Sequence, residues 1–166
     1  MPGDIEAIEA IEVEAVTLHI GFVMLPEYTL STFSNAVGIL RMANRLSGKE
    51  LYHWSLHSVG GQSVVSSAGL ELALDGGLDA ASEADIMLVC GGYSVKSHCD
   101  KPLLDGLRKM AKRKIPMGGI CTGSYALAAA GLLDGYRCTI HWENLASLRE
   151  EFPKLEISSS LFVIDR

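Results

Sequence analysis

The sequence contains no apolar run long enough to cross a membrane. A spanning helix needs about 20 consecutive apolar residues, and polar residues interrupt every hydrophobic stretch well before that length. The first fifteen residues contain no lysine or arginine, whereas a secretory signal peptide begins with a basic segment. We therefore expect a protein that neither enters a membrane nor is exported, and we place it in the cytoplasm.

The four cysteines lack the spacing of a metal site. Cys90, Cys99, Cys121 and Cys138 form no Cys-x-x-Cys pair and have no histidine cluster beside them, which argues against zinc. Scattered cysteines suit a reducing compartment better than a disulfide framework. No glycine-rich phosphate loop or dinucleotide fingerprint follows any predicted strand. We expect no metal, no disulfide and no nucleotide cofactor.

Basic residues are missing from one end of the chain, where negative charge is concentrated. The net charge is −6 over 166 residues, and five acidic residues fall in the first fifteen, which leaves −1 for residues 16–166. We expect residues 1–15 to be a disordered acidic leader and residues 16–166 to be one domain. A near-neutral body is not a nucleic-acid-binding surface. Any contact with DNA would need another module.

Strands and helices alternate along the rest of the chain. The β-branched run at 16–25 predicts a strand, and apolar residues at helical spacing predict a helix over 29–46. The further predicted strands are 51–59, 63–67, 70–74, 85–90, 115–120, 138–140, 155–157 and 160–164; the further helices are 101–112, 126–130 and 143–151, with a short helix or turn at 78–84. This alternation predicts an open, mostly parallel α/β sheet with helices on both faces.

Residues 114–142 contain a tight turn around a cysteine. The run Gly119-Ile120-Cys121-Thr122-Gly123 between a buried strand and a helix is typical of a nucleophile elbow, because glycine lets strand and helix approach closely. Backbone N–H groups at the start of a helix favour thiolate over thiol. Cys121 is therefore a candidate nucleophile. A buried cysteine in a tight crossover turn is the alternative.

Three predicted strands end in residues that suit a shared crevice. Ligands of open parallel sheets bind beyond the carboxyl ends of the strands, and Pro26, the Gly91-Gly92 turn and Cys121 all follow such ends. The amides of Thr122 and of the glycine turn would donate to an oxyanion formed at the thiol. We expect these segments to converge.

A working thiol also needs an acid or a base. Glu27 follows the first strand, and His141 follows the elbow helix, so either side chain is a candidate partner for the thiol. Each has an ordinary alternative: an exposed loop glutamate, or a structural histidine packed by Trp142.

Several motifs together resemble a known family. The chain is similar to the PfpI/ThiJ-type, class I glutamine amidotransferase-like domain, and within it to the sensor domain of GlxA-like, AraC-family transcription regulators. The motifs that carry the resemblance are Gly119 to Gly123, residues 128–135, Thr139-Ile140-His141-Trp142, and residues 40–46, 51–54 and 161–165. The resemblance covers about residues 18–166 and implies a flavodoxin-like fold.

The chain departs from the enzymes of that superfamily. Similar hydratases carry an aspartate in a Leu-Asp-x-x-Gly-Pro pattern of the first helix, and Thr32 stands where that acid would be. The amidotransferase base, a histidine followed by Pro-Glu, has no counterpart, since His141 belongs to a different position. A thiol without these partners favours an inherited pocket over working chemistry.

The resemblance implies an effector-sensing domain with a small metabolite above Cys121. Its branch is similar to regulators of quaternary-amine and amino-acid catabolism, so an amine or amino acid such as betaine, carnitine or arginine is the expected effector. Tyr28, Tyr93 and Trp142 would supply an aromatic wall for a cation, or would be ordinary boundary aromatics. The other expected ligand-binding residues are Gly91, Gly92, Thr32 and Thr122.

Regulators of this type continue past Asp165 to complete the domain and then carry a helix-turn-helix module. The sequence is therefore expected to lack its C-terminal end and the module through which DNA would be bound. An exposed sheet edge favours a homodimer. Two alternatives remain: a cysteine-dependent hydrolase or hydratase that uses Cys121 with Glu27 or His141, and a redox sensor that oxidises Cys121.

Overall fold

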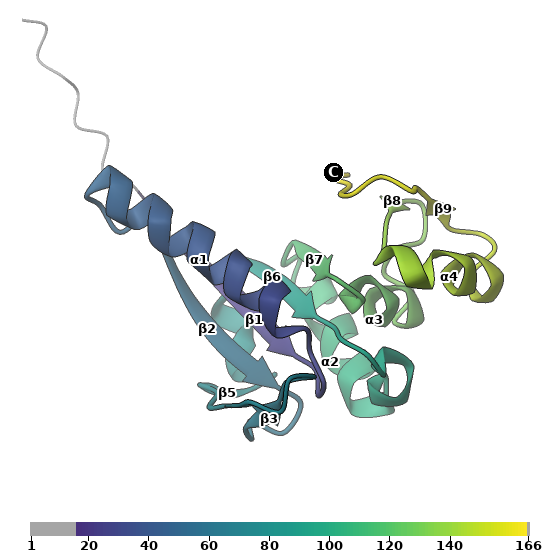
Figure 1. Cartoon of the computed structure of the whole chain (residues 1–166), viewed down its shortest axis with the longest axis horizontal. Helices are drawn as coiled ribbons and strands as arrows, with labels where there is room; N and C mark the ends of the chain where they lie inside the picture. The colour runs from purple at the N-terminus through teal and green to yellow at the C-terminus, as the bar shows by residue number, and fades with distance from the viewer. Residues whose placement is uncertain (1–15, 166) are drawn as a thin grey trace, which may run out of the picture.

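The structure is a computed structural model that describes residues 16–165 (Figure 1). The predicted acidic leader, residues 1–15, lies outside the described residues. Among residues 16–165, no helix is both long and apolar enough to span a bilayer.

A parallel five-stranded sheet forms the centre of the domain. Its strands are β1 (Leu18–Met24), β2 (Tyr52–Ser58), β5 (Gly76–Gly77), β6 (Ile86–Cys90) and β7 (Met117–Ile120), in the order β5-β2-β1-β6-β7. Without the two-residue β5, the order is second, first, third, fourth, which is that of a flavodoxin-like sheet. The open parallel sheet predicted from the sequence is confirmed.

Helices cover both faces of this sheet, and each face has its own apolar core. The helix α1 (Leu30–Ser47) lies along one face, where Phe33 packs with Phe22 and Met24. The helices α2 (Lys101–Lys112) and α3 (Gly123–Ala129) cover the other. Alternate residues of β1 point to opposite cores, as the pleat of a strand requires.

Local signals explain where the longer helices begin and end. Gly48 takes a left-handed conformation (φ 66°) and closes α1. At the start of α2, the Asp100 carboxylate accepts a hydrogen bond from the amide of Leu103, at 3.0 Å, which satisfies one of the free N–H groups of the first turn. These caps fix the helix boundaries close to the predicted ones.

Smaller elements surround the sheet. They are the antiparallel pair β3 (Val64–Val65) and β4 (Glu71–Leu72), the parallel pair β8 (Arg137–Cys138) and β9 (Glu156–Ile157), the 3₁₀ turns η1 (Ala80–Glu83), η2 (Val95–His98) and η3 (Trp142–Asn144), and the helix α4 (Leu145–Glu151). Figure 1 shows α4, β8 and β9 together beyond α3. A third core centred on Leu148 holds this group.

One predicted strand is wrong. Residues 160–164 form no strand, and Leu161 and Ile164 are 97% and 85% exposed. Their apolar character suits a strand, but none of the described strands pairs with them. The turn η2 was also missed, because its polar sequence has no helical periodicity.

Candidate functional site

Cys121 sits in a strained turn between β7 and α3. Its φ angle is +59°, a left-handed conformation that is uncommon for a residue with a side chain. The glycines beside it are sterically required. A Cβ on Gly123 would lie 1.9 Å from the carbonyl oxygen of Val89, and a Cβ on Gly119 would lie 2.2 Å from the amide of Ser124. The backbone thus has the geometry of a nucleophile elbow.

Two further turns close against the elbow. The hydroxyl of Thr122, which is 4% exposed, donates to the carbonyl of Gly92 at 2.8 Å. The amide of Thr29 donates to the carbonyl of Gly91 at 3.2 Å. The ends of β1, β6 and β7 therefore meet beside the point where the strand order reverses, the usual ligand position in such sheets.

The thiol has one described polar neighbour. The Thr29 hydroxyl lies 3.5 Å from the Cys121 Sγ atom. Among the hydrogen bonds of residues 16–165, none uses the amide N–H of Gly92 or of Thr122. Thr29 was not foreseen from the sequence.

The Glu27 carboxylate contacts His98 and Ser94 rather than the thiol. Like Cys121 it has a φ of +59°, and its carboxylate lies 3.5 Å from the Nε2 atom of His98. The hydroxyl of Ser94, and to a smaller extent His98, lower the pKa of Glu27. No hydrogen bond within residues 16–165 joins Glu27 to Cys121.

His141 contacts the elbow through its backbone. Its amide donates to the Cys121 carbonyl at 3.1 Å. Its imidazole Nδ1 lies 3.7 Å from the Glu143 carboxylate, and its ring centroid lies 5.8 Å from that of Trp142. The imidazole is thus close to the elbow while its described contacts are with η3.

The predicted aromatic wall is only partly available. Tyr93 and Trp142 are 87% and 71% exposed. Tyr28 is 1% exposed and packs edge-on against Phe33, with ring centroids 5.8 Å apart. The expectation that Tyr28 faces a ligand is wrong, because it belongs to the core under α1.

The Thr32 hydroxyl forms a hydrogen bond at the start of its own helix. Its hydroxyl donates to the carbonyl of Thr29 at 2.8 Å, within the first turn of α1. That bond ties Thr32 to the residue that contacts the thiol. A hydroxyl held in this way supplies no proton-transfer group comparable to a carboxylate.

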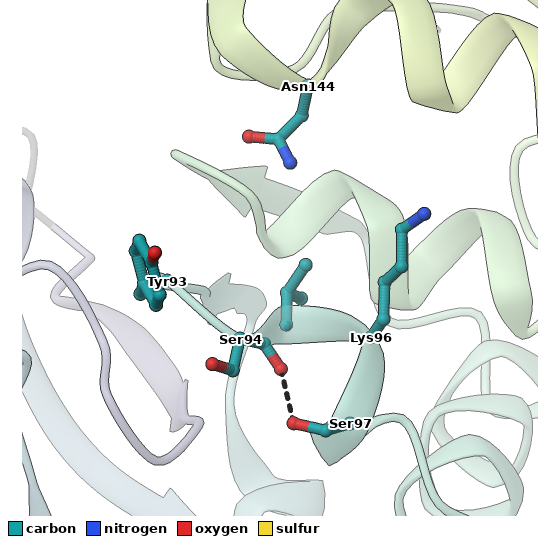
Figure 2. A pocket seen from close by; sticks show the side chains of 6 residues that line it. Tyr93, Ser94, Lys96, Ser97 and Asn144 are labelled. Atoms are coloured by element: carbon teal, nitrogen blue, oxygen red, sulfur yellow. Dashed lines mark hydrogen bonds between the residues drawn. The ribbon is translucent and has the colours of Figure 1, made fainter.

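A shallow open pocket lies next to these turns. Its volume is about 280 Å³, and it is lined by Tyr93, Ser94, Val95, Lys96, Ser97 and Asn144. Figure 2 shows Tyr93 and Lys96 on opposite sides, with Asn144 facing η2 from across the pocket. The amide of Asn144 donates to the carbonyl of His141 at 2.8 Å, which connects the pocket to the elbow.

The pocket and the predicted site overlap only in part. Tyr93 belongs to both, whereas Cys121 does not line the pocket. The residues missed by sequence reasoning are Thr29, Ser94, Lys96, Ser97, His98 and Asn144. The only signal was the polar run after Gly92, which follows a strand end. Among residues 16–165, no group of three potential ligands can hold a metal ion.

The fold and elbow agree with a family match. The model of the DJ-1/PfpI family matches residues 31–159. The chain belongs to the DJ-1/PfpI family.

Its relatives place it near a group of regulators. Over 147 residues the chain is 46% identical to the HTH-type transcriptional regulator GbdR of Pseudomonas aeruginosa, an alignment that covers 89% of this chain and 40% of the regulator. It is 37% identical over 150 residues to the HTH-type transcriptional regulator GlxA of Rhizobium meliloti, which covers 88% of this chain and 45% of that protein. The chain thus spans less than half the length of these relatives.

A solved structure supports the same assignment. The crystal structure of an AraC family transcriptional regulator from Pseudomonas putida superimposes with a TM-score of 0.80 at 32% identity, covering 90% of this chain and 80% of that chain. The resemblance to GlxA-like regulators is confirmed.

Proposed function

We propose that this chain is the effector-sensing domain of an AraC-family transcription regulator, with a small metabolite bound in the crevice beside Cys121. The observation that carries the proposal is the 46% identity to GbdR, named as a transcriptional regulator, along 89% of this chain. The site supports it, because the thiol has a hydroxyl neighbour at 3.5 Å and no described acid or base in contact.

The surroundings of the pocket favour an amine or amino acid. The exposed rings of Tyr93 and Trp142 offer faces to a cation. The pKa of Glu27 is lowered by the Ser94 hydroxyl, so its carboxylate stays ionised at neutral pH and attracts the same charge. Betaine, carnitine and arginine are the compounds to test.

DNA would be bound by a helix-turn-helix module outside these residues, in a homodimer. The near-neutral body of the domain suits a sensor rather than a DNA-binding surface. The exposed apolar side chains of Leu161 and Phe162 favour pairing with a second copy.

A thermal-shift screen tests the sensor function. A ligand at one hundred times its Kd stabilises the folded state by about 2.7 kcal/mol, or roughly 5–11 °C in Tm for a domain of this size. Tyr93→Ala should reduce the shift, and Phe162→Ala, which removes another largely exposed ring outside the pocket, should not. If no amine or amino acid moves Tm, the proposal fails.

A cysteine-dependent hydrolase or hydratase is the second candidate, favoured by the left-handed φ of Cys121. Turnover of amide, glyoxal or isocyanide substrates that is lost in Cys121→Ala and kept in Cys99→Ala would establish it. The sensor proposal would then need revision.

The same cysteines allow a test of redox sensing. Burial raises the pKa of Cys90 to about 12 and that of Cys99 to about 11, so both thiols stay protonated at pH 8. Peroxide followed by mass spectrometry should therefore spare Cys90 and Cys99. Equal oxidation of all four cysteines would exclude a special role for Cys121.

A further inference from the structure

The pocket contains one cation, and that cation is already bound to a carboxylate of the same chain. Lys96 lines the pocket from η2. Its Nζ atom forms an ion pair with the Glu151 carboxylate and donates to the Ser147 hydroxyl at 2.8 Å. Figure 2 shows the Lys96 side chain extending along the side of the pocket opposite Tyr93.

Glu151 has other donors besides Lys96. The Tyr125 hydroxyl donates to one oxygen of its carboxylate at 2.6 Å, and the Ser147 hydroxyl donates to the other at 3.0 Å. The Lys96 ammonium also lies 5.6 Å from the centroid of the Tyr125 ring. Because of these hydroxyls, Glu151 would keep hydrogen bonds if it lost Lys96. Removing the lysine therefore does not leave a charged carboxylate without partners.

The start of α4 lies at the pocket, and its end contacts a residue that lines the pocket. Asn144, which lines the pocket, directly precedes α4, and Glu151 is its last residue. The helix is anchored elsewhere by Leu148 in the small third core. The pairing of Lys96 with Glu151 thus connects η2 to the group formed by α4, β8 and β9 around Leu148.

We propose that Lys96 is the carboxylate-binding residue of the pocket, that Glu151 pairs with it in the absence of ligand, and that an effector carboxylate displaces Glu151 from Lys96 and thereby loosens the end of α4, which the Tyr125 hydroxyl still contacts. This inference rests on the proposed sensor function and specifies its ligand as a zwitterion with a carboxylate. The cationic end then faces Tyr93 across the pocket, and the side-chain amide of Asn144, which lines the pocket (Figure 2), is a second donor for the carboxylate.

The energies permit this exchange. Lys96 and Glu151 are 49% and 33% exposed, and pairs of that kind contribute at most about 1 kcal/mol. A ligand carboxylate that brings additional hydrogen bonds competes successfully with such a pair, whereas it would not displace a fully buried one. An ammonium has three donors, so the incoming oxygen approaches from the pocket side before Glu151 leaves.

Matched ligands and matched variants test the proposal by calorimetry on the complete chain. Glycine betaine and choline share a trimethylammonium group, but only betaine has a carboxylate; arginine and agmatine form a second such pair. Wild type should bind the acids at least tenfold more tightly. Glu151→Gln should tighten acid binding by about two- to fivefold. Lys96→Met should weaken it by tenfold or more, with the binding of choline and agmatine unchanged.

Controls come from exposed residues of the same kind elsewhere in the domain. Glu150→Gln and Lys112→Met change the same charges without touching the pocket and should leave all affinities unaltered. Betaine should also speed amide hydrogen exchange at the end of α4 in wild type.

The outcomes separate this inference from the proposed function. If choline binds wild type as tightly as betaine, or if Lys96→Met does not discriminate between them, the carboxylate site is excluded and the sensor function stands. If betaine binds without faster exchange in α4, the displacement of Glu151 is excluded. If none of the four compounds binds any variant, both the inference and the amine or amino-acid effector are overturned.

Discussion

The elbow and the pocket wall lie side by side but are built from opposite kinds of contact. Around Cys121, backbone packs directly on backbone, and Gly123 leaves no room for a single added carbon. Around Lys96, two long side chains meet in a partly exposed ion pair, that of Lys96 with Glu151. The first kind of contact has one arrangement. The second can exchange partners at little cost in free energy.

For the proposed sensor, this difference gives the two regions separate roles. The elbow is a fixed floor for the turns that carry the pocket, whereas a wall held by an exchangeable ion pair can respond to a ligand. A sensor needs both properties, because a ligand shifts an equilibrium only by contacts that differ between two states. The following predictions test the contrast, beginning with the rigid floor.

Replacing Gly123 by alanine should have the largest effect. The new Cβ would lie 1.9 Å from the Val89 carbonyl oxygen, and backbone on that side cannot yield without moving β6. We expect a loss of about 3 kcal/mol or more in the free energy of unfolding, at the upper end for overpacked sites. Urea denaturation measures it.

Gly38→Ala is the matched control, because a Cβ there meets no atom within 4 Å. This glycine lies inside α1, where alanine should stabilise by about 0.5–1 kcal/mol. If Gly123→Ala is no less stable than Gly38→Ala, the elbow is not a rigid region.

Thr122→Val should have an intermediate effect. It removes the buried hydroxyl that donates to the Gly92 carbonyl at 2.8 Å and leaves that carbonyl without its partner, which costs about 1–3 kcal/mol. In Thr17→Val, an exposed hydroxyl bond to Glu50 is lost instead, and a change of no more than about 0.5 kcal/mol is expected. Similar losses in both variants would contradict a tight junction between the elbow and the glycine turn.

Sequence reasoning succeeded where the structure depends on local constraints. The pattern around Cys121 predicts the elbow because only glycine fits at positions 119 and 123, where backbone segments approach closely. The parallel sheet likewise follows from the apolar runs and their spacing. Residues 160–164 show the limit of this approach, since an apolar pattern predicts a strand but not whether another strand pairs with it.

The pocket wall was missed for a different reason. Lys96 and Glu151 are 55 positions apart, and Glu27, in the turn after β1, meets His98 at the end of η2. Nothing in the periodicity of these segments specifies a partner. The same reasoning left Tyr28 as a candidate for the ligand side or for an ordinary boundary position, because its place after a strand does not reveal that its ring packs under α1.

The smallest expected effect concerns the ion pair of the pocket wall and its dependence on pH. The Lys96 ammonium and the Tyr125 hydroxyl lower the pKa of Glu151 from 4.5 to about 2. A depressed pKa means that the folded state binds fewer protons, so the contribution of Glu151 to stability is complete above pH 4.5 and is lost as the pH falls towards 2. Glu151→Gln should therefore be less stable than wild type at pH 7, by no more than about 1 kcal/mol for an exposed pair.

That difference should shrink below pH 4.5 and disappear near pH 2, while Glu150→Gln, one residue earlier on the same helix, should follow wild type throughout. Thermal unfolding in buffers from pH 7 to pH 2 measures both curves at matched ionic strength. A constant offset between Glu151→Gln and wild type across this range would show that the glutamate acts by packing rather than by charge. The pocket wall would then resemble the elbow, and the division of the site into a fixed floor and an exchangeable wall would not hold.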